Sequence, residues 1–286
     1  MGKVIISADS TCDLGEELKS RYEVHYQPYH IEYRDHDYLD GVDIVPEDLY
    51  EGYYADGSLP KTAAVNVQEY VDYFKSLTED GAQVIHFNLG SALSSSHEHA
   101  CLAACEVPGV HVVDSCNLST GTGQLAIRAA RMLEAGATVE ETVEAVKAMR
   151  SRVHTSFVLD TLEFMAAGGR CPQVVSQVGE VLKLRPEIVV DNTDGSMHVG
   201  RLHHGSMRKA VKEYIRNQLK HHEGVLLDDV FITHSGATAP ELIDAAAAEL
   251  REQLPGLERI HVTRASCTIS SHCGPGCLGI IFVTES

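Results

Sequence analysis

The segment Asn88-Leu-Gly-Ser-Ala-Leu-Ser-Ser-Ser-His-Glu-His-Ala100 joins an apolar run to a run rich in Ala and Cys. The apolar run, Val84-Ile-His-Phe87, predicts a buried parallel strand, and residues 97–105 predict a helix. The first N–H groups of a helix lack partners and carry partial positive charge, so a hydroxyl-rich turn before a helix can bind an anion. The simpler interpretation is an N-cap that only begins the helix. Both interpretations stay open at this point.

The side chains of this turn indicate which anion would fit. The turn contains Ser91, Ser94, Ser95 and Ser96, and it contains no Lys or Arg. Neutral donors favour a singly charged carboxylate, because a multiply charged phosphate is usually met by basic side chains. The turn therefore predicts a carboxylate site, if it binds an anion at all.

Composition excludes some classes of function. The 286 residues include 23 basic and 41 acidic ones, a formal charge of −18, which argues against nucleic-acid binding. No run approaches the ~20 apolar residues of a membrane span, and the N-terminus enters a strand without a signal peptide. We expect a cytoplasmic protein without stable membrane insertion and with reduced thiols. Cys101 and Cys105, four residues apart on a predicted helix, are expected to face the core.

The order of predicted elements suggests two domains. In the first half, strands and helices alternate, which predicts a parallel sheet with helices on both faces. In the second half, Asn192-Thr-Asp-Gly195 is a hairpin signal, which predicts antiparallel strands in a mixed sheet. The fold class is therefore α/β, with an N-terminal three-layer α/β/α domain over 1–156 and a C-terminal α+β domain over 157–286. We also predict a loop over 58–62 and a short helix over 176–184.

Four start signals for helices stand out. Asn66 is expected to cap a helix that begins at Val67. The stretch 9–13 suits a turn that caps a helix from Leu14. Two further segments, 138–141 and 238–241, have the capping-box pattern.

A glycine pattern and a cysteine cluster each have two interpretations. Gly121-Thr-Gly-Gln-Leu-Ala126 matches a dinucleotide fingerprint, but seven residues separate it from the preceding strand, so close packing of helix on sheet is favoured. Cys267, His272, Cys273 and Cys277 suggest a metal, but no Cys-x-x-Cys pair occurs among them, so buried thiols without a metal are favoured. His272, beside a Gly-Pro-Gly turn, could instead donate a hydrogen bond to a bound anion.

Taken together and in order, seven segments resemble the motifs of the DegV family of bacterial proteins. The segments are Ser7–Leu14, Lys61-Thr62, Leu89–Ala100, Asp114–Gly123, Thr161–Arg170, Leu182–Pro186 and His272–Gly276. They are similar, respectively, to S-D-S-T-x-D-L, the T of T-S-Q-P-S, I-S-S-x-L-S-G-T-Y-x-S-A, D-S-x-x-x-S-x-G-x-G, T-L-E-Y-L-x-x-G-G-R, L-L-x-I-K-P and H-x-G-P-G. The chain departs from the family at 63–66, at Ser95-Ser96 and at His97, where the family often has Tyr.

The resemblance implies a fatty-acid-binding subunit of a bacterial fatty acid kinase. An acyl chain would lie between two domains, with its carboxylate at Thr62, Ser94, Ser95 and His272. Arg170 and Gly274 would lie near the head group. The chain itself would be a monomer and no enzyme, with no metal or cofactor besides the bound long-chain fatty acid. A separate ATP-binding kinase subunit would convert the acid to an acyl phosphate for phospholipid synthesis.

An enzymatic alternative remains. Ser94 or Ser95 together with His272 could form a serine-dependent hydrolase or acyltransferase. The G-x-S-x-G nucleophile elbow is absent from the sequence, which weakens this alternative.

Overall fold

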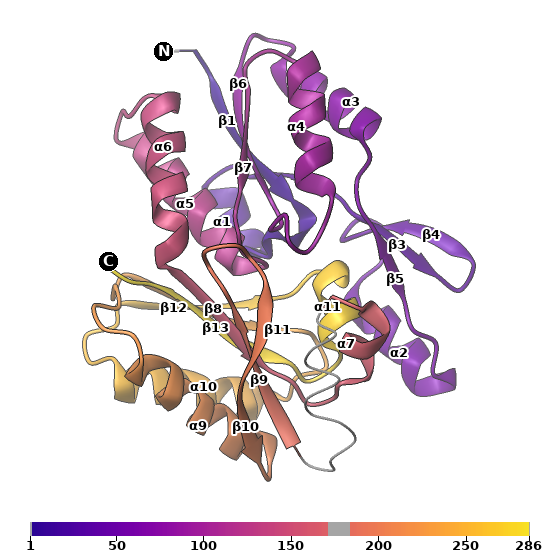
Figure 1. Cartoon of the computed structure of the whole chain (residues 1–286), viewed down its shortest axis with the longest axis vertical. Coiled ribbons are helices and arrows are strands. Elements are labelled where there is room, and N and C mark those ends of the chain that lie inside the picture. Colours follow the sequence, from indigo (N-terminus) through magenta and orange to yellow (C-terminus); the bar gives the residue numbers. More distant parts are fainter. Residues whose placement is uncertain (1, 171–183, 286) are drawn as a thin grey trace.

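Of the three sheets in the described part of the chain, the first is parallel, as predicted. The computed structural model describes residues 2–170 and 184–285, and Figure 1 shows the whole chain. The strand order is β2-β1-β6-β7, with every neighbouring pair parallel. The strands are β1 Val4–Asp9, β2 His25–Gln27, β6 Gln83–Asn88 and β7 Val110–Asp114. Parallel strands end at the same edge of a sheet, so the ends of β1 and β6 lie together.

Helices cover both faces of this sheet. In Figure 1, α3 and α4 lie on one side of it, and α5 and α6 lie on the other. This half includes the helices η1 Ser10–Cys12, α1 Gly15–Arg21, α3 Val67–Thr78, α4 Ser96–Glu106, α5 Thr120–Glu134, α6 Val139–Met149 and η2 Arg150–Arg152. The predicted three-layer arrangement is confirmed.

The second sheet is mixed and has six strands in the order β10-β9-β8-β13-β11-β12. Among its described strands, β11 and β12 run parallel and the other neighbouring pairs run antiparallel, and the predicted hairpin is the antiparallel pair of β9 and β10. The strands are β8 Val153–Val158, β9 Leu184–Val190, β10 Met197–His204, β11 Asp229–His234, β12 Arg259–Arg264 and β13 Leu278–Val283. α9 Met207–Lys220 and α10 Pro240–Gln253 pack against each other and on this sheet.

Two predictions about this half, the domain boundary and the helix over 176–184, stay untested. The predicted boundary between residues 156 and 157 falls within β8, and the division into domains stays a prediction. All six residues of β8 pair with β13, so the strand itself belongs to the mixed sheet. The helix predicted over 176–184 lies outside the described residues, except for Leu184, which begins β9.

A third, small sheet and one short helix were not predicted. The sheet has the order β4-β3-β5, with β3 His30–Tyr33, β4 His36–Leu39 and β5 Lys61–Ala63. The loop predicted over 58–62 is therefore wrong at its end, because Thr62 pairs with Ile31 of β3. Beside this sheet lie α2 Pro46–Asp56, α7 Glu163–Gly168 and α11 Cys267–Cys273, and α11 was not predicted (Figure 1).

Of the four helix starts, two are confirmed. Asn66 caps α3, and Thr138 caps α6 with the predicted capping box. The capping box at 238–241 is wrong, because Thr238 bonds to the carbonyls of Gly236 and Cys277 instead. The cap predicted for α1 is also wrong, because Leu14 stands at the N-cap of this helix and makes no side-chain cap.

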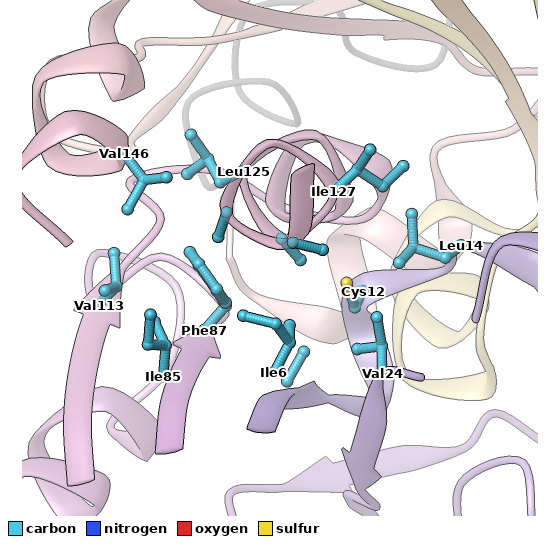
Figure 2. Packing of buried hydrophobic residues seen from close by; sticks show 14 of the residues in the cluster. Ile6, Cys12, Leu14, Val24, Ile85, Phe87, Val113, Leu125, Ile127 and Val146 are labelled. Carbon is cyan, nitrogen blue, oxygen red and sulfur yellow. The ribbon is translucent and has the colours of Figure 1, made fainter. Parts of the chain in front are cut away.

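A shared core joins the two large sheets. Figure 2 shows Ile6, Ile85 and Phe87 of the parallel sheet on one side of α5 and Leu125 and Ile127 of this helix on its other side, and all five belong to one buried cluster. The same cluster includes apolar side chains of the mixed sheet, namely Val153, Phe231, Ile281 and Val283. Because α5 packs against both sheets, it fixes their relative position, and with it the space between their facing edges. No described helix is long and apolar enough to cross a membrane.

Candidate ligand site between the sheets

A cavity of about 210 Å³ lies where the turn before α4 meets β5, α7 and α11. This volume far exceeds the ~10–15 Å³ that one buried water needs. Its walls include five residues predicted for the site, namely Thr62, Ser94, Ser95, Arg170 and His272. Gly274 is not among the lining residues; it ends α11 at a positive φ of 72°, where a Cβ would lie 2.8 Å from the ring of Phe164.

Ser94 is held as a hydrogen-bond donor toward this cavity. Its Oγ accepts from the Tyr29 hydroxyl at 3.0 Å and from the Ser96 N–H at 3.2 Å. A hydroxyl has two lone pairs and one hydrogen, so both acceptor positions are taken. The hydrogen can reach Ser96 Oγ only at 3.3 Å, longer than the usual 2.7–2.8 Å for two hydroxyls. Ser94 can therefore give its hydrogen to a ligand at little cost.

Tyr29 can donate a hydrogen bond to Ser94 because its hydroxyl stays protonated. It is 2% exposed, and burial, aided by the negative charge of Asp9, raises the pKa of its hydroxyl well above the ordinary value. At any physiological pH the phenol therefore donates to Ser94. Tyr29 was not predicted as a site residue, since nothing local in the sequence connects it to a serine 65 residues away.

Thr62 and His272 form the second polar pair, with 2.9 Å between Thr62 Oγ1 and His272 Nε2. Burial, aided by the positive charge of Arg170, lowers the pKa of His272 to about 4, so the ring is neutral at pH 7. Its Nδ1 has no partner among the described residues, and a Cβ on Gly168 would lie 2.0 Å from this atom. In the tautomer that carries its proton on Nε2, the ring donates to Thr62 and leaves the threonine hydrogen for a ligand, as at Ser94.

A cation and an exposed hydroxyl complete the polar end. Arg170 is exposed, lines the cavity and donates to the carbonyl of Gly168 at 2.8 Å. Ser95 is exposed and does not cap α4 with its side chain. Ser91 does not offer its donors to the cavity, because its N–H and its hydroxyl both donate to Asp114, at 3.1 and 2.6 Å. The polar end can thus offer neutral donors and one positive charge to an anion.

The rest of the cavity is apolar. Its wall includes Leu89, Leu93, Leu118, Phe157, Met165 and Ile269. A second chamber of about 30 Å³ lies further inward and shares Leu118, Phe157, Ile269 and Cys273 with the first. Such a site, with a few polar groups at one end and apolar walls behind them, suits an amphipathic ligand with an elongated tail.

The glycine pattern serves packing, as predicted. A Cβ on Gly121 would lie 2.1 Å from Asn117 Oδ1, and one on Gly123 would lie 2.6 Å from Leu14 Cδ2. The first turns of α5 are buried throughout, which leaves no open N-terminus there for a pyrophosphate.

The cysteines gave one confirmed prediction and one error. Cys267, Cys273 and Cys277 are buried free thiols, as expected. Over residues 2–170 and 184–285, no three His, Cys, Asp or Glu side chains gather to hold a metal. The prediction that Cys101 and Cys105 face the core is wrong, because Cys105 is exposed and Cys101 only partly buried. Ala100 and Ala103 face the core instead, so the apolar side of α4 is its alanine side.

Comparisons with known proteins agree with this architecture. A family model described as "Uncharacterised protein, DegV family" matches residues 3–285. A DegV domain-containing protein of Clostridium perfringens is 26% identical and covers 100% of both chains. A solved structure described as "Fatty Acid Binding of a DegV family Protein from Thermus thermophilus" is 25% identical, covers 99% of both chains and has a TM-score of 0.87.

A second solved structure is similar in fold. It is described as a fat acid (stearic acid)-binding protein from Eubacterium ventriosum. It is 23% identical, covers 100% of this chain and 99% of the other, and has a TM-score of 0.84.

Proposed function

This chain belongs to the DegV family, and we propose that it binds a long-chain fatty acid in the cavity between its two large sheets. The carboxylate lies at Thr62, Ser94, Ser95 and His272, near the charge of Arg170. The tail extends along the apolar wall toward the inner chamber. The observation that carries the proposal is the pair of hydroxyls, Ser94 and Thr62, at the polar end of an apolar cavity.

The two ends of the ligand contribute differently. Burial stabilises the bound state by ~0.8 kcal/mol per CH₂, so a long tail contributes roughly 10 kcal/mol before costs. Each hydrogen bond to the charged carboxylate adds ~1.5–3 kcal/mol. The tail therefore sets the affinity, and the hydroxyls set which end of the ligand points outward.

We infer that the bound acid is presented to a separate ATP-dependent kinase subunit in the cytoplasm, which forms the acyl phosphate used in phospholipid synthesis. The exposure of Ser95 and Arg170 supports this inference, because it brings the head-group end close to the surface. The sequence has no G-x-x-x-x-G-K-[ST] phosphate loop with which the chain could use ATP in the Walker manner. A monomer with domains 1–156 and 157–286 remains part of the proposal.

The geometry supports binding better than serine catalysis. A nucleophilic serine needs a base within hydrogen-bond reach, oriented by a third group. His272 pairs with Thr62, and its Nδ1 meets no carboxylate among the described residues. Ser94 accepts from Tyr29, which cannot act as its base. A serine-reactive fluorophosphonate that labels Ser94 or Ser95 would favour the enzymatic alternative.

Extraction and mass spectrometry of the gently purified protein test the proposal, with a long-chain fatty acid as the expected ligand. The double variant Thr62→Val and Ser94→Ala should bind the acid at least tenfold more weakly, from the loss of two charged hydrogen bonds. Ser91→Ala is the matched control, because Ser91 lies on the same turn but bonds to Asp114. A protein that carries no lipid and takes none up would refute the proposal.

A further inference from the structure

Asp40 is a buried carboxyl group at which three distant segments of the chain meet. It directly follows the last residue of β4, is 2% exposed and does not line the ligand cavity. Its oxygens accept four hydrogen bonds: from Ser10 Oγ at 3.0 Å, from the Cys267 N–H at 2.8 Å, and from the N–H and hydroxyl of Thr268 at 3.1 and 2.6 Å. A buried carboxyl group needs donors for both oxygens, and these four satisfy it.

One set of these bonds leads from Asp40 to Tyr29. The Asp40 N–H donates to the Tyr29 carbonyl at 2.9 Å. Ser10 gives its only hydroxyl hydrogen to Asp40, so its oxygen is left to accept the Tyr29 N–H, at 3.2 Å. Both backbone groups of Tyr29 are therefore held, one by Asp40 directly and one through Ser10. Because the Tyr29 hydroxyl donates to Ser94, the place of this donor depends on Asp40.

The other set leads from Asp40 to His272. Cys267 and Thr268, which donate to Asp40, are the first two residues of α11. A helix of seven residues is not stable by itself, and a carboxyl group at its first turn stabilises it by taking up N–H groups that have no partner within the helix. His272 follows Thr268 by four residues, about one turn further along. The direction in which His272 meets Thr62 is thus fixed at the same carboxyl group.

We propose that Asp40 is a positioning residue for the head-group end of the cavity: it holds Tyr29 and α11 in a fixed relation, so that Ser94 and Thr62 meet the same ligand carboxylate. This inference rests on the proposed function. The two hydroxyls are oriented by residues from distant parts of the chain, and Asp40 is bonded to both parts. Without this common acceptor the two polar pairs can shift relative to each other, and hydrogen bonds to one carboxylate tolerate such a shift poorly.

An alternative role for Asp40 is to hold the small sheet together. The backbone of β4 already pairs with β3, from His30 with Leu39 to Tyr33 with His36. The described side-chain partners of Asp40 belong to η1 and α11, outside this sheet. The pattern of contacts therefore favours a role in joining the parts of the site over a role within the sheet.

The test uses two ligands that share a tail and differ at the head group. Binding of hexadecanoic acid and of hexadecan-1-ol is measured by competition with a cyclodextrin and mass spectrometry. Asp40→Asn keeps the shape of the side chain but replaces one acceptor oxygen by a donor. Ser10→Ala leaves Asp40 in place and removes only the hydroxyl that accepts the Tyr29 N–H. Asp43→Asn is the matched control, because Asp43 lies three residues further on, is exposed and accepts from the Leu39 N–H.

We expect Asp40→Asn to weaken binding of the acid about tenfold, the effect of one hydrogen bond to a charged group, and Ser10→Ala to weaken it about threefold. Binding of the alcohol should change much less, and Asp43→Asn should leave the acid-to-alcohol ratio as in the wild type. A wild-type ratio in Ser10→Ala, or in Asp40→Asn that folds by circular dichroism, would overturn the inference, whether both affinities fall together or neither falls. If Asp40→Asn does not fold, Ser10→Ala alone decides. If the wild-type protein binds no acid, the proposed function itself fails, and this is seen before any variant is compared.

Discussion

Acidification should destabilise the lipid-free protein through His272. The pKa of this ring is about 4 in the folded protein and 6.5 in an unfolded chain, so the unfolded chain binds the proton more tightly. The contribution of the neutral His272 ring to the free energy of unfolding is fully present above pH 6.5, and it is lost as the pH falls toward 4. From 1.36 kcal/mol per pKa unit, the loss is about 2 kcal/mol at pH 5 and about 3 kcal/mol at pH 4.

Urea unfolding of lipid-free protein at pH 7, 6 and 5 measures this loss. The variant His272→Gln should lose about 2 kcal/mol less than the wild type between pH 7 and pH 5, because its side chain does not titrate. His154→Gln provides a control, because burial and the nearby His222 also lower the pKa of His154 to about 4, but His154 does not line the cavity.

Loading with a fatty acid distinguishes the two histidines. A carboxylate beside His272 favours the charged ring and raises its pKa, so the loaded protein should be less sensitive to acid. The same loading should leave the contribution of His154 unchanged. If His272→Gln unfolds with the pH dependence of the wild type, the burial and proton assignment of this ring are wrong.

Three further perturbations test other parts of the site. Tyr29→Phe should weaken acid binding about tenfold in competition assays, because Ser94 loses the donor that orients it. Gly168→Ala should displace the ring of His272, since the new Cβ would lie 2.0 Å from Nδ1, and a lower melting temperature and weaker acid binding are expected. Ala265→Val, in the wall of the inner chamber only, should reduce affinity for the longest acyl chains about fourfold per displaced CH₂ and spare shorter ones.

The sequence predicted the large elements because each has its own periodic pattern. The strands of the parallel sheet are apolar runs, and the cap at Asn66 and the hairpin at 192–195 are local signals. α11 was missed because it is seven residues long and rich in Ser, Thr and Cys, so no amphipathic period can be recognised. β5 has three residues, and its pairing with β3 depends on a partner about 30 residues away.

The site residues were predicted by resemblance, whereas their roles required the structure. Ser94, Thr62 and His272 stand in segments with family motifs, but no motif shows whether a hydroxyl donates or accepts. That property depends on Tyr29 for Ser94 and on His272 for Thr62, 65 and 210 residues away in the chain. Long-range partners of this kind leave no periodic signal in a single sequence.

The same dependence explains why the site is distributed over the whole fold. A hydroxyl in water exchanges its partners freely and recognises no particular ligand, so a selective donor has to be fixed by neighbours that occupy its lone pairs. Here the neighbours come from different elements: the segment before β3 supplies Tyr29, and α11 supplies His272. α5, packed between the two sheets, fixes their relative position. Loss of packing around α5 should therefore impair recognition of the head group before it abolishes binding of the tail. Hydrogen bonds tolerate smaller changes in distance and angle than apolar contacts do.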